Sequence, residues 1–159
     1  MSKSIGNVLT LDDIIERGYD PMDLRYYLLS VHYRTNLKFS WDGLEQARIS
    51  RKRIEQWVQG GGMAAVAGRI DHSEDVPVML VAEVKKYYQD FVNAMNADLN
   101  ISAALAAIFS CMNHVNAYGG IEHEAAEAAK IFSSVVRDTF GCFHTESIIP
   151  DDVEKLLSE

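Results

Sequence analysis

The first residues of the chain have the chemistry of a phosphate-binding loop. Ser2, Lys3 and Ser4 stand together, and Gly6 comes shortly after them. Hydroxyl groups and backbone amides donate hydrogen bonds to phosphate oxygens, a lysine adds a mobile positive charge, and a glycine lets the backbone approach closely. Taken by themselves, four such residues more often belong to a disordered tail, so their interpretation depends on the motifs that lie downstream in the chain.

A basic segment lies within an otherwise acidic chain. The net charge is −8, but the segment from Arg25 to Glu55 carries +4, which leaves −12 for the remainder. Phosphate binding responds to the local field rather than to the total charge. The segment therefore predicts an RNA-contacting face, although a solvated helix face is the alternative. The candidate residues are Arg34, Lys38, Arg48, Arg51, Lys52 and Arg53.

Length and composition indicate one globular domain. The chain has 159 residues, of which 48% are hydrophobic and 24% charged, the usual balance of a soluble protein. No apolar run approaches the ~20 residues of a membrane span. Two cysteines are too few for a disulfide framework, which favours a reducing, cytoplasmic setting. We expect a monomer with no membrane or DNA partner.

Helix signals succeed one another along the chain. Thr10 with Asp12 and Asp13, and Asp20 with Pro21, predict two helix starts, while Gly18 and Gly141 predict helix ends. The second helix has one apolar face of Leu24, Tyr27, Leu28 and Val31. Strand alternation and internal repeats are absent, so the pattern predicts an all-α antiparallel bundle. The expected helices cover about residues 11–17, 21–33, 41–58, 75–95, 102–118 and 122–140, with a last one starting at 150.

Two other patterns have a structural interpretation that outweighs a functional one. Cys111 and His114, with Cys142 and His144, supply four zinc-type ligands, but single cysteines in helices are usually small buried hydrophobes. We therefore expect no metal site. The pairs 26–27 and 87–88 are tyrosines that could stack on RNA bases, yet at helical spacing one of each pair normally lies in the core.

Several ordered motifs resemble one family. Residues 1–7, MSKSIGN, resemble the KMSKSxGN signature of class I aminoacyl-tRNA synthetases without its first lysine. Residues 20–30, DPMDLRYYLLS, resemble the helix that names the DALR anticodon-binding domain. The stretches HYR at 32–34, FSW at 39–41 and FVNAMNADLN at 91–100 narrow the resemblance to the cysteinyl-tRNA synthetase family. The resemblance extends from Met1 to about Phe143.

This resemblance implies a fold, a partner and a role for the first residues. The fold would be a DALR-type helical bundle at 41–145, preceded by a loop and stem-contact connector at 1–40 and followed by the start of a C-terminal extension at 146–159. Lys3 would contact the phosphates of ATP, with Ser2, Ser4 and Gly6 shaping the loop. The partner would be tRNA(Cys).

The same resemblance implies that other parts of the enzyme lie outside these residues. In the family, a Rossmann-type catalytic domain with the HIGH motif and a zinc site precedes the KMSKS loop, and a basic anticodon-reading segment comes after the bundle. We therefore expect ATP and zinc to act in the intact enzyme, no cofactor in this chain, and no activity from this chain alone.

Two alternative functions remain open at this point. One is the related ligase that attaches cysteine to an amino-sugar, although the motifs near Phe39 and Met95 favour the tRNA enzyme. The other is a free-standing helical interaction module without a ligand.

Overall fold

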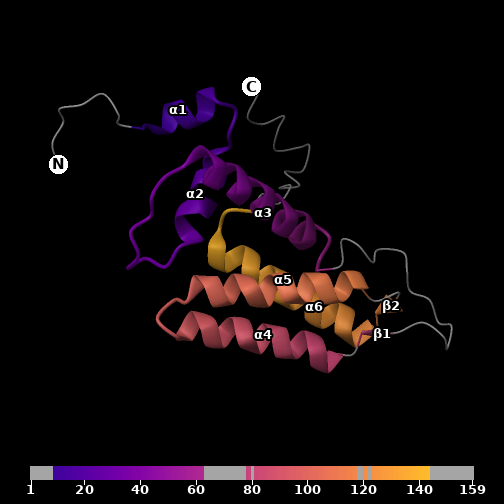
Figure 1. Ribbon diagram of the computed structural model, residues 1–159. Coiled ribbons are helices and arrows are strands. Elements are labelled where there is room, and N and C mark those ends of the chain that lie inside the picture. Colours follow the sequence, from indigo (N-terminus) through magenta and orange to yellow (C-terminus); the bar gives the residue numbers. More distant parts are fainter. Residues whose placement is uncertain (1–8, 63–77, 80, 118–119, 122, 144–159) are drawn as a thin grey trace, which may run out of the picture.

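The computed structural model describes residues 9–62, 78–79, 81–117, 120–121 and 123–143. Within these residues it is an all-α structure, which confirms the predicted fold class (Figure 1). The helices are α1 (Leu11–Glu16), α2 (Pro21–Leu29), α3 (Trp41–Gln59), α4 (Val81–Asn96), α5 (Ile101–Ala117) and α6 (His123–Phe140).

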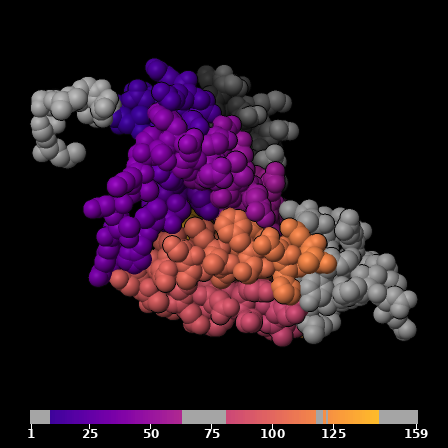
Figure 2. All heavy atoms as spheres, in the orientation of Figure 1, coloured from indigo at the N-terminus to yellow at the C-terminus, as the bar shows by residue number. Residues whose placement is uncertain are grey.

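The helices are arranged in two groups that pack on each other. α1 and α2 pack with α3, while α4, α5 and α6 lie side by side as a three-helix unit. α3 joins the two groups because it contacts both α5 and α6. The space-filling view shows residues 9–62 on the α5 side of the three-helix unit, with α4 at the opposite edge (Figure 2). The group of α1, α2 and α3 therefore contains most of the basic segment, and the three-helix unit packs beneath that group.

One small strand pair was not expected from the sequence. β1 (Val78–Met79) pairs in parallel with β2 (Gly120–Ile121), with Val78 opposite Gly120 and Met79 opposite Ile121. Strands of two residues are too short for side-chain alternation to be visible in a sequence. The pair links the segment before α4 to the segment before α6.

The two helix starts predicted at Thr10 and Asp20 are confirmed in atomic detail. The Thr10 hydroxyl accepts a hydrogen bond from the Asp13 amide at 3.3 Å, and the Asp13 carboxylate accepts one from the Thr10 amide at 2.7 Å. The Asp20 carboxylate accepts from the Met22 amide at 2.7 Å, and that of Asp23 accepts from the Asp20 amide at 3.0 Å. Such reciprocal caps satisfy amides that a first helical turn leaves unpaired.

The predictions for α2 and α4 were wrong in part. α2 ends at Leu29 rather than near residue 33, and Ser30 caps it. Its buried residues are Asp23, Tyr26 and Tyr27, whereas Leu28 is 56% exposed. The helical period was right, but the buried face is rotated because Asp23 has an interior partner. α4 begins at Val81 instead of residue 75, and residues 75–77 lie outside the described part, as do 144–159.

The core is one continuous cluster from Ile14 to Phe143. Its centre is Phe132 of α6, whose ring centroid lies 5.5 Å from Trp57, 5.7 Å from Tyr88 and 5.5 Å from Phe91. These edge-on contacts join α3, α4 and α6, and each buried aromatic ring removes a large apolar area from water. The framework under α3 is therefore tightly packed.

Candidate nucleic-acid interface

The predicted phosphate loop lies outside the described residues. Ser2, Lys3, Ser4 and Gly6 all precede residue 9, where the described part begins. Their role toward ATP stays a prediction from the sequence motif.

Four of the predicted RNA-contacting residues lie on α3. They are Arg48, Arg51, Lys52 and Arg53. With 3.6 residues per turn, neighbouring positions on a helix point about 100° apart. The four side chains therefore occupy different environments, and the segment is not a single stripe.

Arg51 lies in the interior, with a side chain only 2% exposed. Its Nε donates to Asp23 Oδ1 at 2.7 Å, and its Nη1 donates to Glu55 Oε1 at 2.9 Å and to the carbonyl of Cys142 at 3.2 Å. Asp20 lies 3.8 Å from Nη2. Burial by itself lowers the pKa of Arg51, but these acids outweigh it and raise the pKa above its ordinary value. The structure therefore removes Arg51 from the exposed basic set.

Arg48 is half-buried at the edge of the same network. Its Nη1 lies 3.6 Å from Glu45 Oε2 and its Nε lies 4.0 Å from Asp23 Oδ2. The guanidinium carbon also lies 5.4 Å from the centre of the Tyr19 ring. Arg48 thus contacts acidic and aromatic side chains of the protein on one side, while a third of its side chain stays exposed to solvent.

Lys52 and Arg53 are exposed on α3. Among the described residues, no hydrogen bond or ion pair engages the Lys52 ammonium group. Arg53 leans on α5, where its guanidinium lies 5.5 Å from the Phe109 ring centre and donates to Asn113 Oδ1 at 3.4 Å. Both groups keep donors available to an anion from solvent.

Arg34 and Lys38 lie in the link between α2 and α3. Arg34 is 68% exposed, and its Nη2 lies 3.3 Å from Asp98 Oδ2, at the turn between α4 and α5. Its Nε donates to the hydroxyl of Tyr33 at 2.8 Å. The side chain of Lys38 is exposed, and its carbonyl accepts a hydrogen bond from the Tyr27 hydroxyl at 3.2 Å. Contacts on both sides thus fix the path of this link.

Sequence reasoning missed one basic residue beside this segment. This residue is Arg17, the C-terminal cap of α1. Its guanidinium carbon lies 3.9 Å from the centre of the Trp41 ring, at the start of α3. Tyr19 stacks on Trp41 with ring centroids 6.0 Å apart. In the sequence, Arg17 followed by Tyr19 two positions later is only a weak signal of a nucleic-acid contact. Nothing in the sequence indicates that Trp41 lies beside these two residues.

Three of the four residues weighed as a metal site lie in the described part of the chain, where they have other environments. Cys111 and Cys142 are buried, and burial raises the pKa of Cys111 to about 12 and that of Cys142 to about 11. His114 Nδ1 shares a hydrogen bond of 2.6 Å with the Tyr87 hydroxyl. His144 lies outside the described residues. In the described part of the chain, no three metal-binding side chains come together.

The two tyrosine pairs differ from each other. Tyr26 and Tyr27 are both in the core, 3% and 8% exposed, so both rings of this pair are unavailable to an RNA base. Burial is also the main cause that raises the pKa of Tyr26. Tyr87 and Tyr88 are partly buried against the core.

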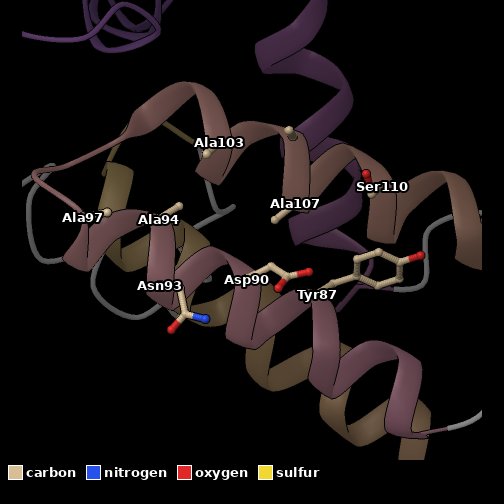
Figure 3. Close-up of a pocket in the computed structure, with 9 residues that line it drawn as sticks. Tyr87, Asp90, Asn93, Ala94, Ala97, Ala103, Ala107 and Ser110 are labelled. Carbon is tan, nitrogen blue, oxygen red and sulfur yellow. The ribbon is translucent and has the colours of Figure 1, made fainter.

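A groove of about 490 Å³ lies between α4 and α5 (Figure 3). Alanines form most of its wall, and its polar groups come from Tyr87, Asp90, Asn93 and Ser110. The lining includes the Asp90 carboxylate and, among the described residues, no lysine or arginine. Such a lining repels phosphate, so this groove is not part of the basic surface.

Comparisons with known proteins agree with the motifs. Residues 1–49 match the family model described as the class I (C) tRNA synthetase catalytic domain, and residues 90–143 match the DALR domain. The cysteine–tRNA ligase of Sulfurihydrogenibium sp. is 34% identical over 90% of this chain and 31% of its own length. That of Persephonella marina is 33% identical over the same shares, and that of Bacillus cereus is 30% identical over 100% of this chain and 34% of its own length.

The chain belongs to the cysteine–tRNA ligase family. It spans about a third of the length of the curated cysteine–tRNA ligases it matches. The catalytic-domain match reaches from the serine–lysine segment into α3, and the DALR match covers the end of α4 with α5 and α6. The suspected family is thereby confirmed. The domain boundaries at 40 and 145 stay predictions.

One further property concerns membranes. Within the described residues of this cysteine–tRNA ligase relative, none of the helices is long and apolar enough to cross a bilayer.

Proposed function

We propose that this chain is the tRNA-contacting C-terminal part of a cysteine–tRNA ligase. In the intact enzyme, cysteine reacts with ATP to form cysteinyl-adenylate and pyrophosphate, and the cysteinyl group then passes to the 3′ end of tRNA(Cys). Within that scheme the chain would contribute the lysine that contacts the ATP phosphates, Lys3, and a helical surface for the tRNA.

The observation that supports this proposal best is that exposed cations gather in and just after the catalytic-domain match. Lys52 and Arg53 lie shortly after the catalytic-domain match, which ends at residue 49, and they are on the helix that joins both halves of the fold. Arg34 and Lys38 lie within that match and are exposed. Contacts from such side chains to phosphates position a nucleic acid without reading its sequence. The proposal therefore assigns backbone contacts to these four residues and to the exposed part of Arg48.

The remaining parts of the proposal rest on the family. ATP and a zinc ion that grips the substrate thiol would act in the intact enzyme, and this chain would hold neither by itself. We assign it a cytoplasmic location and a monomeric state, in line with the composition and the two buried cysteines.

A binding experiment tests the tRNA assignment. The dissociation constant of the chain for tRNA(Cys) is measured by filter binding at several salt concentrations, for the wild type and for the charge-reversed variant K52E/R53E. Because phosphate contacts release counterions, the wild type should bind more weakly as salt rises, and the variant should show lower affinity with a shallower salt dependence.

The matched control is R137E, which reverses an arginine of α6 that is paired with Asp138 at 2.7 Å. It should bind like the wild type. Equal binding by the wild type, K52E/R53E and R137E, or binding indifferent to salt, would contradict the proposed function.

A further inference from the structure

Four side chains form a ladder of alternating charge and aromatic surface, here named the arginine–aromatic ladder: Arg17, Trp41, Tyr19 and Arg48. Arg17 lies 3.9 Å from the Trp41 ring centre, Trp41 and Tyr19 stack at 6.0 Å with 28° between their planes, and Arg48 lies 5.4 Å from the Tyr19 ring centre. The ladder joins the end of α1 to the first half of α3.

The contact with Trp41 holds Arg17 while leaving its donors open. A guanidinium that lies over an aromatic face keeps its N–H groups, which point outward in its own plane, available for hydrogen bonds. Among the described residues, no hydrogen bond or ion pair engages the Arg17 side chain. The Asp13 carboxylate acts on it electrostatically, but that carboxylate is mainly occupied by hydrogen bonds from Thr10. Arg17 is therefore a cation held in position, and within the described part of the chain its N–H donors have no protein acceptor.

The aromatic members of the ladder are occupied within the chain. Trp41 contacts Phe39 edge-on at 5.1 Å in addition to Arg17 and Tyr19. Partial burial and a hydrogen bond with Glu45 raise the pKa of Tyr19. Because both rings already contact neighbouring side chains, they are better suited to positioning Arg17 than to stacking on an RNA base.

The ladder continues the exposed basic side of α3. Arg48 and Lys52 are four residues apart on one helix, a spacing that places their side chains about 6 Å from each other on the same face. Glu45 offsets part of the charge of Arg48 at 3.6 Å. Among the described residues, neither Lys52 nor Arg17 forms an ion pair of this kind. Together, Arg17, Arg48 and Lys52 extend the basic surface of α3 toward α1.

We propose that Arg17 binds a phosphate of the RNA backbone and that Trp41 and Tyr19 are positioning residues that hold its guanidinium in place. This inference rests on the proposed function and adds a contact that the basic segment of the sequence does not contain. Phosphate is the fitting ligand because its oxygens accept two parallel hydrogen bonds from a planar guanidinium.

The first test measures binding of tRNA(Cys) by R17A and R17K across a salt series. R17A should lose about tenfold in affinity, and the slope of log affinity against log salt should fall by about one, as for one lost phosphate contact. R17K should keep the slope but lose part of the affinity, because an ammonium group does not reproduce the planar, stacked fork. R137A is the matched control and should match the wild type in both quantities.

The second test uses tryptophan fluorescence, since the chain has two tryptophans and Trp57 is only 3% exposed. Quenching of Trp41 by acrylamide should fall when tRNA(Cys) is added to the wild type, and this protection should be reduced in R17A. W41L should weaken the binding of tRNA(Cys) but keep the slope of log affinity against log salt. The charge of Arg17 remains in this variant, but the Trp41 ring no longer keeps its guanidinium in position. Circular dichroism melting of each variant checks that it is folded.

The outcomes separate this inference from the proposed function. If R17A keeps the wild-type affinity and slope while K52E/R53E binds weakly, the role of Arg17 is refuted and the proposed function stands. If K52E/R53E also binds like the wild type, the proposed function itself fails. A loss of affinity and slope in R17A, with R137A unchanged, supports both.

Discussion

The hydroxyl of Tyr33 donates a hydrogen bond of 2.6 Å to Asp98 Oδ1 and joins two segments 65 residues apart. Both residues belong to motifs that resemble the cysteinyl-tRNA synthetase family, one in the α2–α3 link and one in the α4–α5 turn. Arg34 adds an ion pair of 3.3 Å to the same carboxylate. The hydrogen bond with Asp98 is the main cause that raises the pKa of Tyr33. The two motifs thus form one contact that ties the basic link to the bundle.

The backbone at this contact is strained. Asp98 and Leu99 have φ of 54° and 53°, in the left-handed region. Aspartate tolerates this region better than leucine does, and each such residue costs of the order of 1–3 kcal/mol. The contacts of Asp98 with Tyr33 and Arg34 help to offset that cost.

Replacing Asp98 should therefore give a graded loss of stability. D98A removes the acceptor and keeps the strained backbone, so the free energy of unfolding should fall by about 1 kcal/mol. D98G also loses the acceptor, but glycine accepts positive φ, so its loss should be smaller. Urea unfolding followed by circular dichroism measures both. Equal stability of D98A and the wild type would show that the contact contributes nothing.

The buried pair of Arg51 and Asp23 should be the most sensitive polar contact. R51A removes the nearest charged partner of the Asp23 carboxylate, which is 1% exposed, and removing one member of such a buried pair costs about 3–5 kcal/mol. The same urea measurement applies, with R53A as the matched control on the exposed side of α3. R53A should stay within about 0.5 kcal/mol of the wild type. Similar losses for the two variants would contradict the burial of Arg51.

Two glycines with similar backbone angles should respond differently to alanine. Gly62 has φ +83°, and an added Cβ would lie 2.5 Å from the Ala129 carbonyl oxygen, whereas Gly18 has φ +81° and open space around it. G18A should cost only the left-handed strain, about 1–2 kcal/mol. G62A adds a clash with the backbone of α6 and should cost clearly more. Thermal melting compares them, and equal melting temperatures would refute the close approach of residue 62 to α6.

Stability should fall at alkaline pH because of the buried thiols. The folded state raises the pKa of Cys111 from 9.0 to about 12, so it holds its proton where the unfolded state loses it. The stabilisation is complete below pH 9 and is lost as the pH rises toward 12, by about 1.4 kcal/mol per pH unit for one thiol. The free energy of unfolding is measured by urea from pH 8 upward. C111A should show a shallower decline, and an identical decline would exclude Cys111 as a cause.

The sequence by itself determined the local structure and the family. The caps at Thr10 and Asp20 and the helix ends at Gly18 and Gly141 depend on residues within one turn, so they can be predicted from neighbours in the chain. The ordered motifs likewise indicate the cysteinyl-tRNA synthetase family without a structure, and the comparisons confirm it.

Only the tertiary structure decided which charges face solvent. Arg51 and Lys52 are adjacent in sequence, yet Arg51 is interior because Asp23, Glu55 and the carbonyl of Cys142 converge on it. Arg17 was not predicted as a candidate because its partner, Trp41, lies on another helix. The physical reason is that the cost of burying a charge depends on partners brought from distant segments, and helical period and local charge do not contain that information.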